Sequence, residues 1–296
     1  MTKKYETLIM AVALVFMIGV MTGQWREIRA MDLHLTSSLL SLSVAGVVLI
    51  LFLDAFGWHL ILRSLGCRLA ASRSIRIWMI SSLSRYIPGG VWSYSTRIGM
   101  AQAEGVDIAS TSISLYLETL LVMASSLAVG FPALFSAAGM PVTPTMAAVV
   151  WLILGILMHP RLIALARFLP GRAGDAFAIT TLPSIRFTVG LYAYYVLFWI
   201  ALGGVFICFV AAFYPLPHQH WVTVGTSMAL GFFVGFVLVF VPGGIGVRES
   251  ALYLLLLPLM PHSVSLFVSV ASRIWFMAGE GLSVAIVLLA GRKPKL

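Results

Sequence analysis

Long apolar runs, separated by short polar segments, dominate the chain. An apolar run of about 20 residues is long enough to cross a bilayer as an α-helix. By this criterion the sequence predicts an all-α polytopic membrane protein with about eight transmembrane helices. The expected helices lie at about 5–22, 37–62, 108–131, 143–158, 187–213, 221–241, 248–260 and 263–290.

Two proline–glycine–glycine motifs interrupt this pattern. Proline has no backbone donor and glycine has no Cβ, so an α-helix does not continue cleanly through either motif. At membrane depth, irregular backbone is tolerated only where it is buried in protein or lines a polar cavity. We therefore expect a broken or re-entrant element at each motif, with two short helices around the first. The motifs are Pro88-Gly89-Gly90, in the polar stretch 77–103, and Pro242-Gly243-Gly244.

The two motifs lie about half the chain length apart. Interrupted apolar segments at corresponding places indicate a two-fold internal repeat, with each half contributing one broken element to a shared site. We expect a single transmembrane domain, 1–296, with halves at 1–158 and 187–296 joined by the basic segment 159–186.

The composition agrees with a membrane protein. Hydrophobic residues make up 60% and charged residues 10% of the 296 residues, whereas a soluble domain has about 25% charged residues. The mean hydropathy is +1.02. The formal net charge of +9 comes mostly from Lys and Arg between apolar runs, which is typical of cytoplasmic loops, so we expect no nucleic-acid partner.

The positive residues also orient the chain, because cytoplasmic loops carry an excess of Lys and Arg. We expect both termini and the basic segments 63–76 and 159–186 in the cytoplasm, with the protein in a bacterial or archaeal cytoplasmic membrane. In this topology both motifs face or enter from the cytoplasmic side.

Several charged residues lie inside or beside the apolar runs. An ionised side chain at mid-depth costs about 3 kcal/mol on insertion scales, so each needs an explanation. In one interpretation they line a polar cavity, where arginines bind a lipid phosphate and acids neutralise them or carry protons. In the other they are buried pairs that hold helices together, and the sequence leaves both open. The candidate substrate-binding residues are Arg85, Arg97, Arg248, Glu249, Gly89, Gly90, Gly243 and Gly244, and the candidate charge-relay residues are Asp54, Glu118, Arg273 and Glu280.

Position favours the functional interpretation for two of the arginines. Arg97 and Arg248 follow the motifs, and helix ends at a break present free N–H groups that bind anions. Arg273 and Glu280 lie seven residues apart on one expected helix, so they should share a face.

The sequence offers little other chemistry. No nucleophile–base arrangement, Walker loop or dinucleotide fingerprint is present, so we expect no catalytic residues and no cofactor. His218 and His220 alone make an incomplete metal site, and we expect no metal. The glycines expected at helix-packing positions are Gly203, Gly204, Gly231 and Gly235.

The residues around the two motifs also carry a family resemblance. Trp58, the segment 85–92 followed by Arg97, and the segment 242–249 resemble the lysylphosphatidylglycerol synthase/flippase transmembrane family. The resemblance covers nearly the whole chain and implies a helical domain with broken helices. In that family the membrane part is implicated in moving an aminoacyl-phospholipid across the bilayer. Stand-alone members lie beside pathways for polyprenyl-linked sugars, hopanoids or surface glycolipids.

Two departures limit what the resemblance implies. No segment of the chain resembles the soluble aminoacyl-transfer domain of some members, so we do not expect the synthase activity. The family often has Arg directly after the acid at the position of Glu118, whereas this chain has Thr119. Arg97, Arg248 and Glu249 match the family motifs by position.

These expectations describe a lipid flippase. Its substrate would be an anionic phospholipid, an aminoacyl-phospholipid or a polyprenyl-phosphate-linked glycolipid. Two alternatives stay open: a membrane-embedded lipid-modifying transferase with Asp54, Glu118 or Glu249 as general base, and a non-catalytic partner in a lipid or glycan assembly complex. The expected partners are membrane lipids, a second copy of the chain or a lipid-biosynthesis enzyme.

Overall fold

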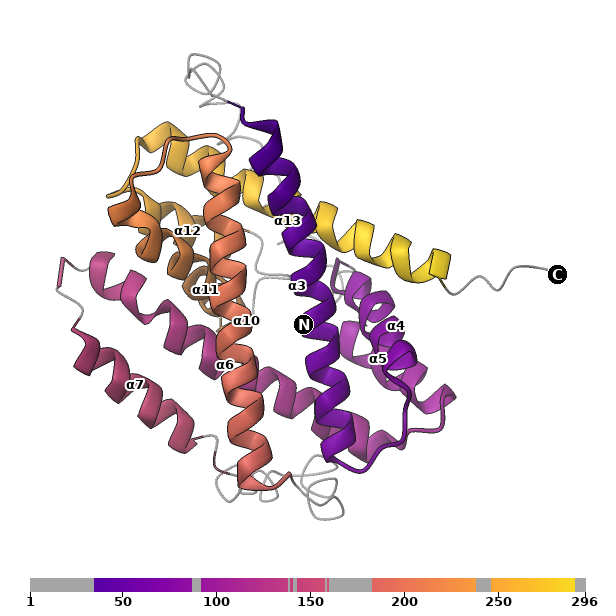
Figure 1. Ribbon diagram of the computed structural model, residues 1–296. Helices are drawn as coiled ribbons and strands as arrows, with labels where there is room; N and C mark the ends of the chain where they lie inside the picture. The colour runs from indigo at the N-terminus through magenta and orange to yellow at the C-terminus, as the bar shows by residue number, and fades with distance from the viewer. Residues whose placement is uncertain are drawn as a thin grey trace, which may run out of the picture.

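The computed structural model describes residues 35–86, 92–137, 139–140, 143–157, 159, 183–237 and 246–290. Within these ranges the regular elements are α-helices and two short 3-10 helices, η1 (Leu83–Tyr86) and η3 (His218–His220). The first expected helix, 5–22, lies outside the described residues. The α-helices are α3 (Ser37–Ser64), α4 (Ala71–Ser82), α5 (Trp92–Ala103), α6 (Ile108–Ala137), α7 (Pro144–Leu157), α10 (Ile185–Ala211), α11 (Trp221–Val237), α12 (Val247–Leu256) and α13 (His262–Ala290) (Figure 1).

Five helical segments in the described part of the chain are long and apolar enough to cross a membrane. They are α3, α6, α10, α13, and α11 together with η3. By contrast, α4 and α5 have 12 residues each and cover only about 18 Å of a hydrocarbon core of about 30 Å. The expected all-helical membrane protein is confirmed, but the described residues hold fewer spans than the apolar runs predicted.

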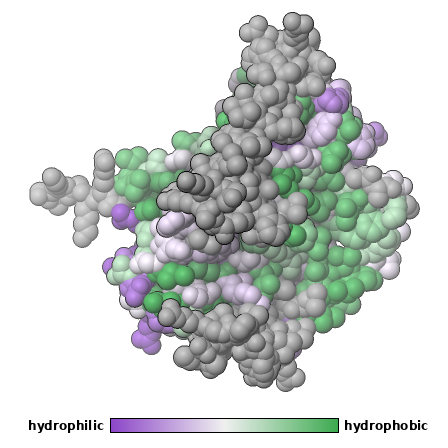
Figure 2. All heavy atoms as spheres, turned by 180° about the vertical axis from the view of Figure 1, so that it is seen from behind, coloured by the Kyte–Doolittle hydropathy of each residue, from purple (hydrophilic) through white to green (hydrophobic). Residues whose placement is uncertain are grey.

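Apolar side chains cover much of the described surface, as Figure 2 shows. Leu42, Leu49, Leu152 and Leu197 are 60–64% exposed. Single exposed leucines are ordinary in soluble proteins, but broad apolar faces mark contact with a partner or a membrane. In a protein with five candidate spans, these faces are suited to contact lipid acyl chains.

Helices α3 and α10 lie side by side and antiparallel (Figure 1). The backbone N–H of Thr36, just before α3, donates to the carbonyl oxygen of Ala212, just after α10, at 2.9 Å. Near the middle of the pair, the Tyr194 hydroxyl donates to the carbonyl oxygen of Leu53 at 2.5 Å. The end of each helix therefore lies beside the start of the other.

The segment α4–η1–α5 forms a helical hairpin, the first hairpin. Arg73, near the start of α4, pairs with Glu104, just after α5, with 2.7 Å between Nη1 and Oε2. A 3.0 Å hydrogen bond between His59 and Ser74 fixes the base of the hairpin near the end of α3. The two short helices expected around the first motif are confirmed, while residues 87–91 lie outside the described ranges.

Helices α11 and α12 form the second hairpin. A Cβ at Gly231 would lie 2.9 Å from Leu252 Cγ, and one at Gly235 would lie 3.0 Å from Arg248 Cβ, so the two helices run antiparallel in close contact. Gly203 likewise contacts the backbone of α11, whereas Gly204 has no neighbour within 4 Å of its Cβ position. The packing role expected for these glycines therefore holds for all except Gly204.

The two hairpins extend from opposite ends of the α3–α10 pair, because α4 follows α3 and α11 follows α10. The expectation that both motifs face or enter from the cytoplasmic side stays a prediction, because the motif residues lie outside the described ranges. The segment 248–260 was expected to cross the membrane, but it holds helix α12, which has 10 residues and covers only about 15 Å of a hydrocarbon core of about 30 Å.

Helix α6 continues past its expected end at residue 131, through Pro132 to Ala137. Proline lacks the N–H that would bond to the carbonyl oxygen of Ala128, one turn earlier. The indole N–H of Trp151, on α7, donates to that oxygen at 2.9 Å. The helix therefore tolerates the proline because a neighbouring helix supplies the missing donor.

Candidate functional site

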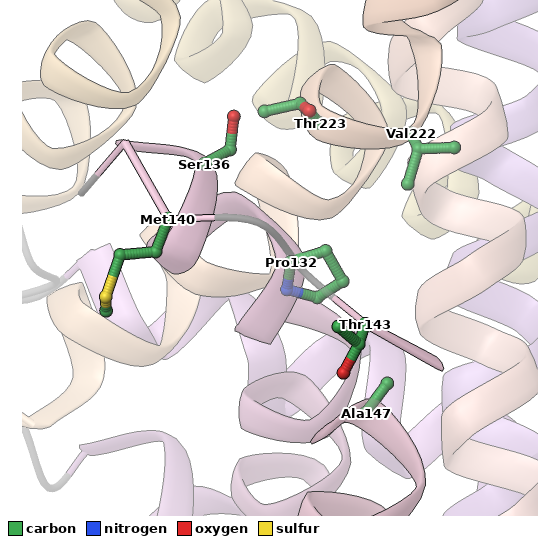
Figure 3. Close-up of a pocket in the computed structure, with 7 residues that line it drawn as sticks. All are labelled: Pro132, Ser136, Met140, Thr143, Ala147, Val222 and Thr223. Carbon is green, nitrogen blue, oxygen red and sulfur yellow. The ribbon is translucent and has the colours of Figure 1, made fainter. Parts of the chain in front are cut away.

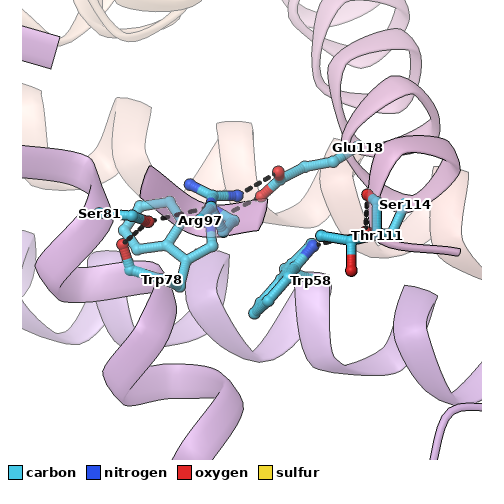
Figure 4. A network of polar contacts seen from close by, with 7 residues as sticks. All are labelled: Trp58, Trp78, Ser81, Arg97, Thr111, Ser114 and Glu118. Atoms are coloured by element: carbon cyan, nitrogen blue, oxygen red, sulfur yellow. Dashed lines mark hydrogen bonds and ion pairs between the residues drawn. The ribbon is translucent and has the colours of Figure 1, made fainter. Parts of the chain in front are cut away.

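Arg97 lies at the centre of a buried polar network (Figure 4). Its Nη1 donates to Glu118 Oε2 at 2.6 Å, and its Nε donates to Ser81 Oγ at 3.1 Å. The other oxygen of Glu118 accepts the indole N–H of Trp78 at 2.7 Å. Arg97 is 6% and Glu118 8% exposed, so their direct pairing offsets the loss of hydration.

Two indole rings enclose the Arg97 guanidinium. Its Cζ lies 5.2 Å from the ring centroid of Trp58 and 5.2 Å from that of Trp78, within cation–π range. Trp58 is oriented by its own hydrogen bond to Ser114 Oγ, at 3.0 Å. Helices α3, α4 and α6 thus form the surroundings of an arginine that projects from α5.

Arg85, in η1, pairs with Glu280 on α13, with 3.3 Å between Nη1 and Oε1. Its Nε also donates to the carbonyl oxygen of Ser82 at 2.9 Å. The Glu280 side chain is 2% exposed, but that of Arg85 is 31% exposed. This ion pair joins the first hairpin to the last described helix, with Arg85 the more exposed partner.

Glu249, at the start of α12, makes the corresponding contact for the second hairpin. Its Oε1 lies 3.2 Å from Nη1 of Arg273 on α13. Its Oε2 accepts the backbone N–H of Gly246 at 2.7 Å. Gly246 has a φ of 83°, a conformation that favours glycine. One carboxylate therefore both satisfies the first turn of α12 and pairs with α13.

Both hairpins contact helix α13 within a short stretch of that helix. Arg273 and Glu280 lie two turns apart, about 10 Å along the helix axis. They were expected to share a face, but their ion-pair partners differ: Arg273 pairs with the second hairpin and Glu280 with the first. Hairpins from opposite ends of the α3–α10 pair therefore meet on one part of α13.

Arg248, near the start of α12, is buried and 8% exposed. Its Nη2 is 3.5 Å from the sulfur of Met228, and its Cζ is 5.4 Å from the ring centroid of Phe276. Phe276 belongs to α13, between the two ion-pairing residues of that helix. Arg248 thus places a third guanidinium against the region where the hairpins meet.

The carboxyl group of Asp54, on α3, lies close enough to two arginines of the first hairpin and to two carboxylates for their charges to act on it. The arginines are Arg85 and Arg97, and the carboxylates are Glu118 on α6 and Glu280 on α13. The Oδ1 of Asp54 is buried and has no hydrogen-bond partner among the described residues. Together these groups comprise three carboxylates and two guanidiniums, which we call the charged cluster. The charged cluster consists of Asp54, Arg85, Arg97, Glu118 and Glu280.

A comparison with known protein families tests the family resemblance that these residues carry. The sequence profile described as lysylphosphatidylglycerol synthase TM region matches residues 5–277. The chain belongs to this family. Membership confirms the resemblance carried by the two motifs and indicates a membrane protein connected with lipids. A search of curated proteins found no match.

The structure brings together the candidate site residues that lie in its described part. Five form the charged cluster, and Arg248, Glu249 and Arg273 lie at the second hairpin. Sequence reasoning missed Trp78 and Ser81, which contact the charges directly. Their spacing of three residues on the polar helix α4 was the available signal. Four motif glycines lie outside the described residues: Gly89, Gly90, Gly243 and Gly244.

A cavity of about 410 Å³ lies elsewhere in this member of the lysylphosphatidylglycerol synthase transmembrane family, between α6, α7 and α11 (Figure 3). Its lining includes Pro132, Ser136 and Thr223 and carries no charged side chain. Pro132 follows Glu118 by about 21 Å along α6, so the cavity is separate from the charged cluster. Among the described residues, no group of three His, Cys, Asp or Glu side chains is arranged to hold a metal ion.

Proposed function

We propose that the protein is a flippase that moves an anionic lipid across the cytoplasmic membrane. The observation that carries this proposal is the meeting of the two hairpins on α13, through ion pairs about 10 Å apart. In secondary transporters, broken helices from two related halves form the substrate site near the bilayer midplane. Membership of a lipid-related membrane family supports a lipid as the cargo.

The order of elements supports two related halves. A long helix, a hairpin and a second long helix occur as α3, first hairpin and α6, and again as α10, second hairpin and α13. Because α3 and α10 are antiparallel, we propose an inverted-topology repeat. Each half has an ion pair between its hairpin and its second long helix, with the charges exchanged: Arg97–Glu118 in one and Glu249–Arg273 in the other.

The exposure of the arginines suggests how a headgroup enters. The side chain of Arg85 is 31% exposed, compared with 7% for Arg97 and 12% for Arg273. In our proposal a lipid phosphate meets Arg85 first and competes with Glu280 for it. Arg97 and Arg248 bind the phosphate in the occluded state, since a guanidinium suits phosphate geometry. The acyl chains remain in the bilayer.

In our proposal the two hairpins begin on opposite sides of the membrane, and the basic residues support this arrangement. Arg63, Arg68 and Arg73 lie near the end of α3, and Arg186 lies at the start of α10. By the positive-inside rule this end is cytoplasmic, as are both termini in our proposal. The first hairpin then starts from the cytoplasmic side and the second from the other side. Access to the shared site alternates when one half rocks against the other.

Lipid movement by purified protein in liposomes tests the proposal. The panel would contain labelled anionic phospholipids, an aminoacyl-phospholipid and a polyprenyl phosphate, with a neutral phospholipid for comparison. We expect headgroup-selective movement that falls about tenfold or more in Arg85→Gln, because a charge-assisted hydrogen bond contributes about 1.5–3 kcal/mol. Arg73→Gln is the matched control, because its ion pair with Glu104 is at the surface: the Arg73 side chain is 64% and the Glu104 side chain 36% exposed.

Two results would contradict the flippase. One is equal movement of the neutral lipid, and the other is an equal loss in both arginine variants. A third result, a modified lipid formed in detergent by wild type and abolished in Glu118→Gln, would favour the transferase instead.

A further inference from the structure

Two buried polar groups on neighbouring helices have no hydrogen-bond partner among the described residues. They are Oδ1 of Asp54, on α3, and the hydroxyl of Tyr195, on α10. Tyr195 is 0% exposed, and its hydroxyl lies 2.6 Å from the position that a Cβ of Gly57 would occupy. Gly57 is three residues after Asp54, so both lie on one side of α3. Buried polar groups are almost always paired, so two unpaired groups in one place call for an explanation.

Groups from every side act on the Asp54 carboxyl. Carboxylates come from α6 and α13, guanidiniums from η1 and α5, and phenols from α10. Helix α13 approaches closely because a Cβ at Gly279, next to Glu280, would overlap the Val47 side chain on α3. The charged and titratable groups are Glu118, Glu280, Arg85, Arg97, Tyr194 and Tyr195.

The three carboxylates differ in their charged partners and hydrogen-bond donors. Glu118 accepts from both Arg97 and Trp78, and Glu280 lies against Arg85. The Oδ1 of Asp54 accepts from none of the described residues. Three carboxylates against two guanidiniums leave one excess negative charge, and an uncompensated buried charge is costly. One proton balances the cluster, and Asp54 is the carboxylate whose ionised form has the fewest donors.

We propose that Asp54 is a proton-binding site whose protonation controls the ion pair between Arg85 and Glu280. When Asp54 is neutral, Arg85 is held by Glu280 and the first hairpin stays fixed to α13. When the proton leaves to water, the Asp54 carboxylate competes for Arg85, and the hairpin loosens from α13. The coupling of this proton to lipid movement rests on the proposed flippase function; the proton site itself does not.

Infrared spectroscopy tests the proton site directly, through the carbonyl stretch of a protonated carboxylic acid in purified protein. We expect this band at neutral pH in wild type and its loss in Asp54→Asn. It should also be lost in Glu280→Gln, which keeps Asp54 but balances the cluster without a proton. Asp107→Asn, outside the cluster, should retain the band. Persistence of the band in either cluster variant would overturn the proposal.

Spin labels test the control of the ion pair. Cysteines at Leu83 and Met277, which are 39% and 43% exposed, would carry the labels in a Cys67→Ser, Cys208→Ala background. We expect the distance between labels to lengthen as pH rises in this background and to stay at its low-pH value after Asp54→Asn. A pH response that survives Asp54→Asn would overturn the proposal. A distance between labels that changes with sodium concentration at constant pH would also overturn the proposal, because a proton would then not be the controlling ion.

These measurements separate the two proposals, because neither uses lipid transport. If both succeed while no lipid in the panel moves, the proton site stands and the flippase fails. If lipid moves with the same pH profile in wild type and Asp54→Asn, the flippase stands and the proton control fails.

Discussion

The indole N–H of Trp151 donates to the carbonyl oxygen of Ala128 at 2.9 Å, the carbonyl that Pro132 leaves without a helical donor. In an apolar environment such an unpaired group is costly. We expect Trp151→Phe, which keeps an aromatic ring but removes the donor, to lower the free energy of unfolding by about 1–3 kcal/mol. Thermal unfolding in detergent measures the loss.

Two further variants isolate the cause of that loss. Pro132→Ala restores a backbone donor, so Trp151→Phe should be much less harmful in its presence. Trp221→Phe is a matched control, because the Trp221 indole donates to Leu216 at 3.3 Å in an exposed position. If Trp151→Phe costs the same with proline or alanine at position 132, the carbonyl of Ala128 is not the reason.

Gly279 sets the distance between α3 and α13. A Cβ there would overlap Val47, a stiff β-branched side chain that cannot rotate away easily. We expect Gly279→Ala to destabilise the protein by about 1–3 kcal/mol through overpacking. Gly281→Ala is the control, since nothing lies within 4 Å of its Cβ position, and it should be neutral or stabilising. Thermal unfolding of the two variants compares them, and equal midpoints would refute the packing argument.

Asp107 caps the start of α6. Its Oδ1 accepts the backbone N–H of Ser110 at 2.7 Å, and this hydrogen bond lowers the pKa of Asp107 below its ordinary value of 3.8. Because the folded-state pKa is depressed, the stabilisation is present above the ordinary pKa and disappears as pH falls through the folded-state pKa. Asp107→Asn should keep the cap and remove this part of the acid sensitivity.

The same cap has a neutral-pH test. Asp107→Ala should lower the free energy of unfolding by about 1 kcal/mol at neutral pH. Unfolding midpoints measured across the acid range give both results. The explanation fails if the asparagine variant loses as much stability on acidification as wild type.

The apolar runs located the long helices well because lipid-facing helices must be apolar along most of their length. The expected segments 37–62, 187–213 and 263–290 end within about two residues of α3, α10 and α13, which is the usual accuracy of helix boundaries. Run length did not show where the chain turns back. The segment 221–241 contains α11, which with η3 is long enough to cross, but 248–260 holds only the 10-residue helix α12, which packs antiparallel against α11.

The candidate site was predictable in its residue types but not in its pairs. Glu118 was identified as a charge inside an apolar run, where desolvation makes it costly alone, and Arg97 was identified because it follows the first motif. Helical periodicity gives the face on which a residue lies, but not which helix packs against it. Arg273 and Glu280 were therefore expected to share a face, but periodicity could not show that each pairs with a different hairpin.

The Arg97–Glu118 ion pair provides the sharpest energetic test, because both side chains are buried and 2.6 Å apart. Glu118→Gln or Arg97→Met alone leaves one buried charge without its partner, which we expect to cost about 3–5 kcal/mol. The double variant removes both charges and should cost clearly less than the sum of the two. The exposed pair Arg73–Glu104 gives the reference cycle, with an expected coupling of about 0–1 kcal/mol. Chemical unfolding of wild type and of the three variants in each cycle measures both couplings. A coupling at Arg97–Glu118 no larger than the reference would mean that hydration, and not the ion pair, sustains these charges in the folded protein.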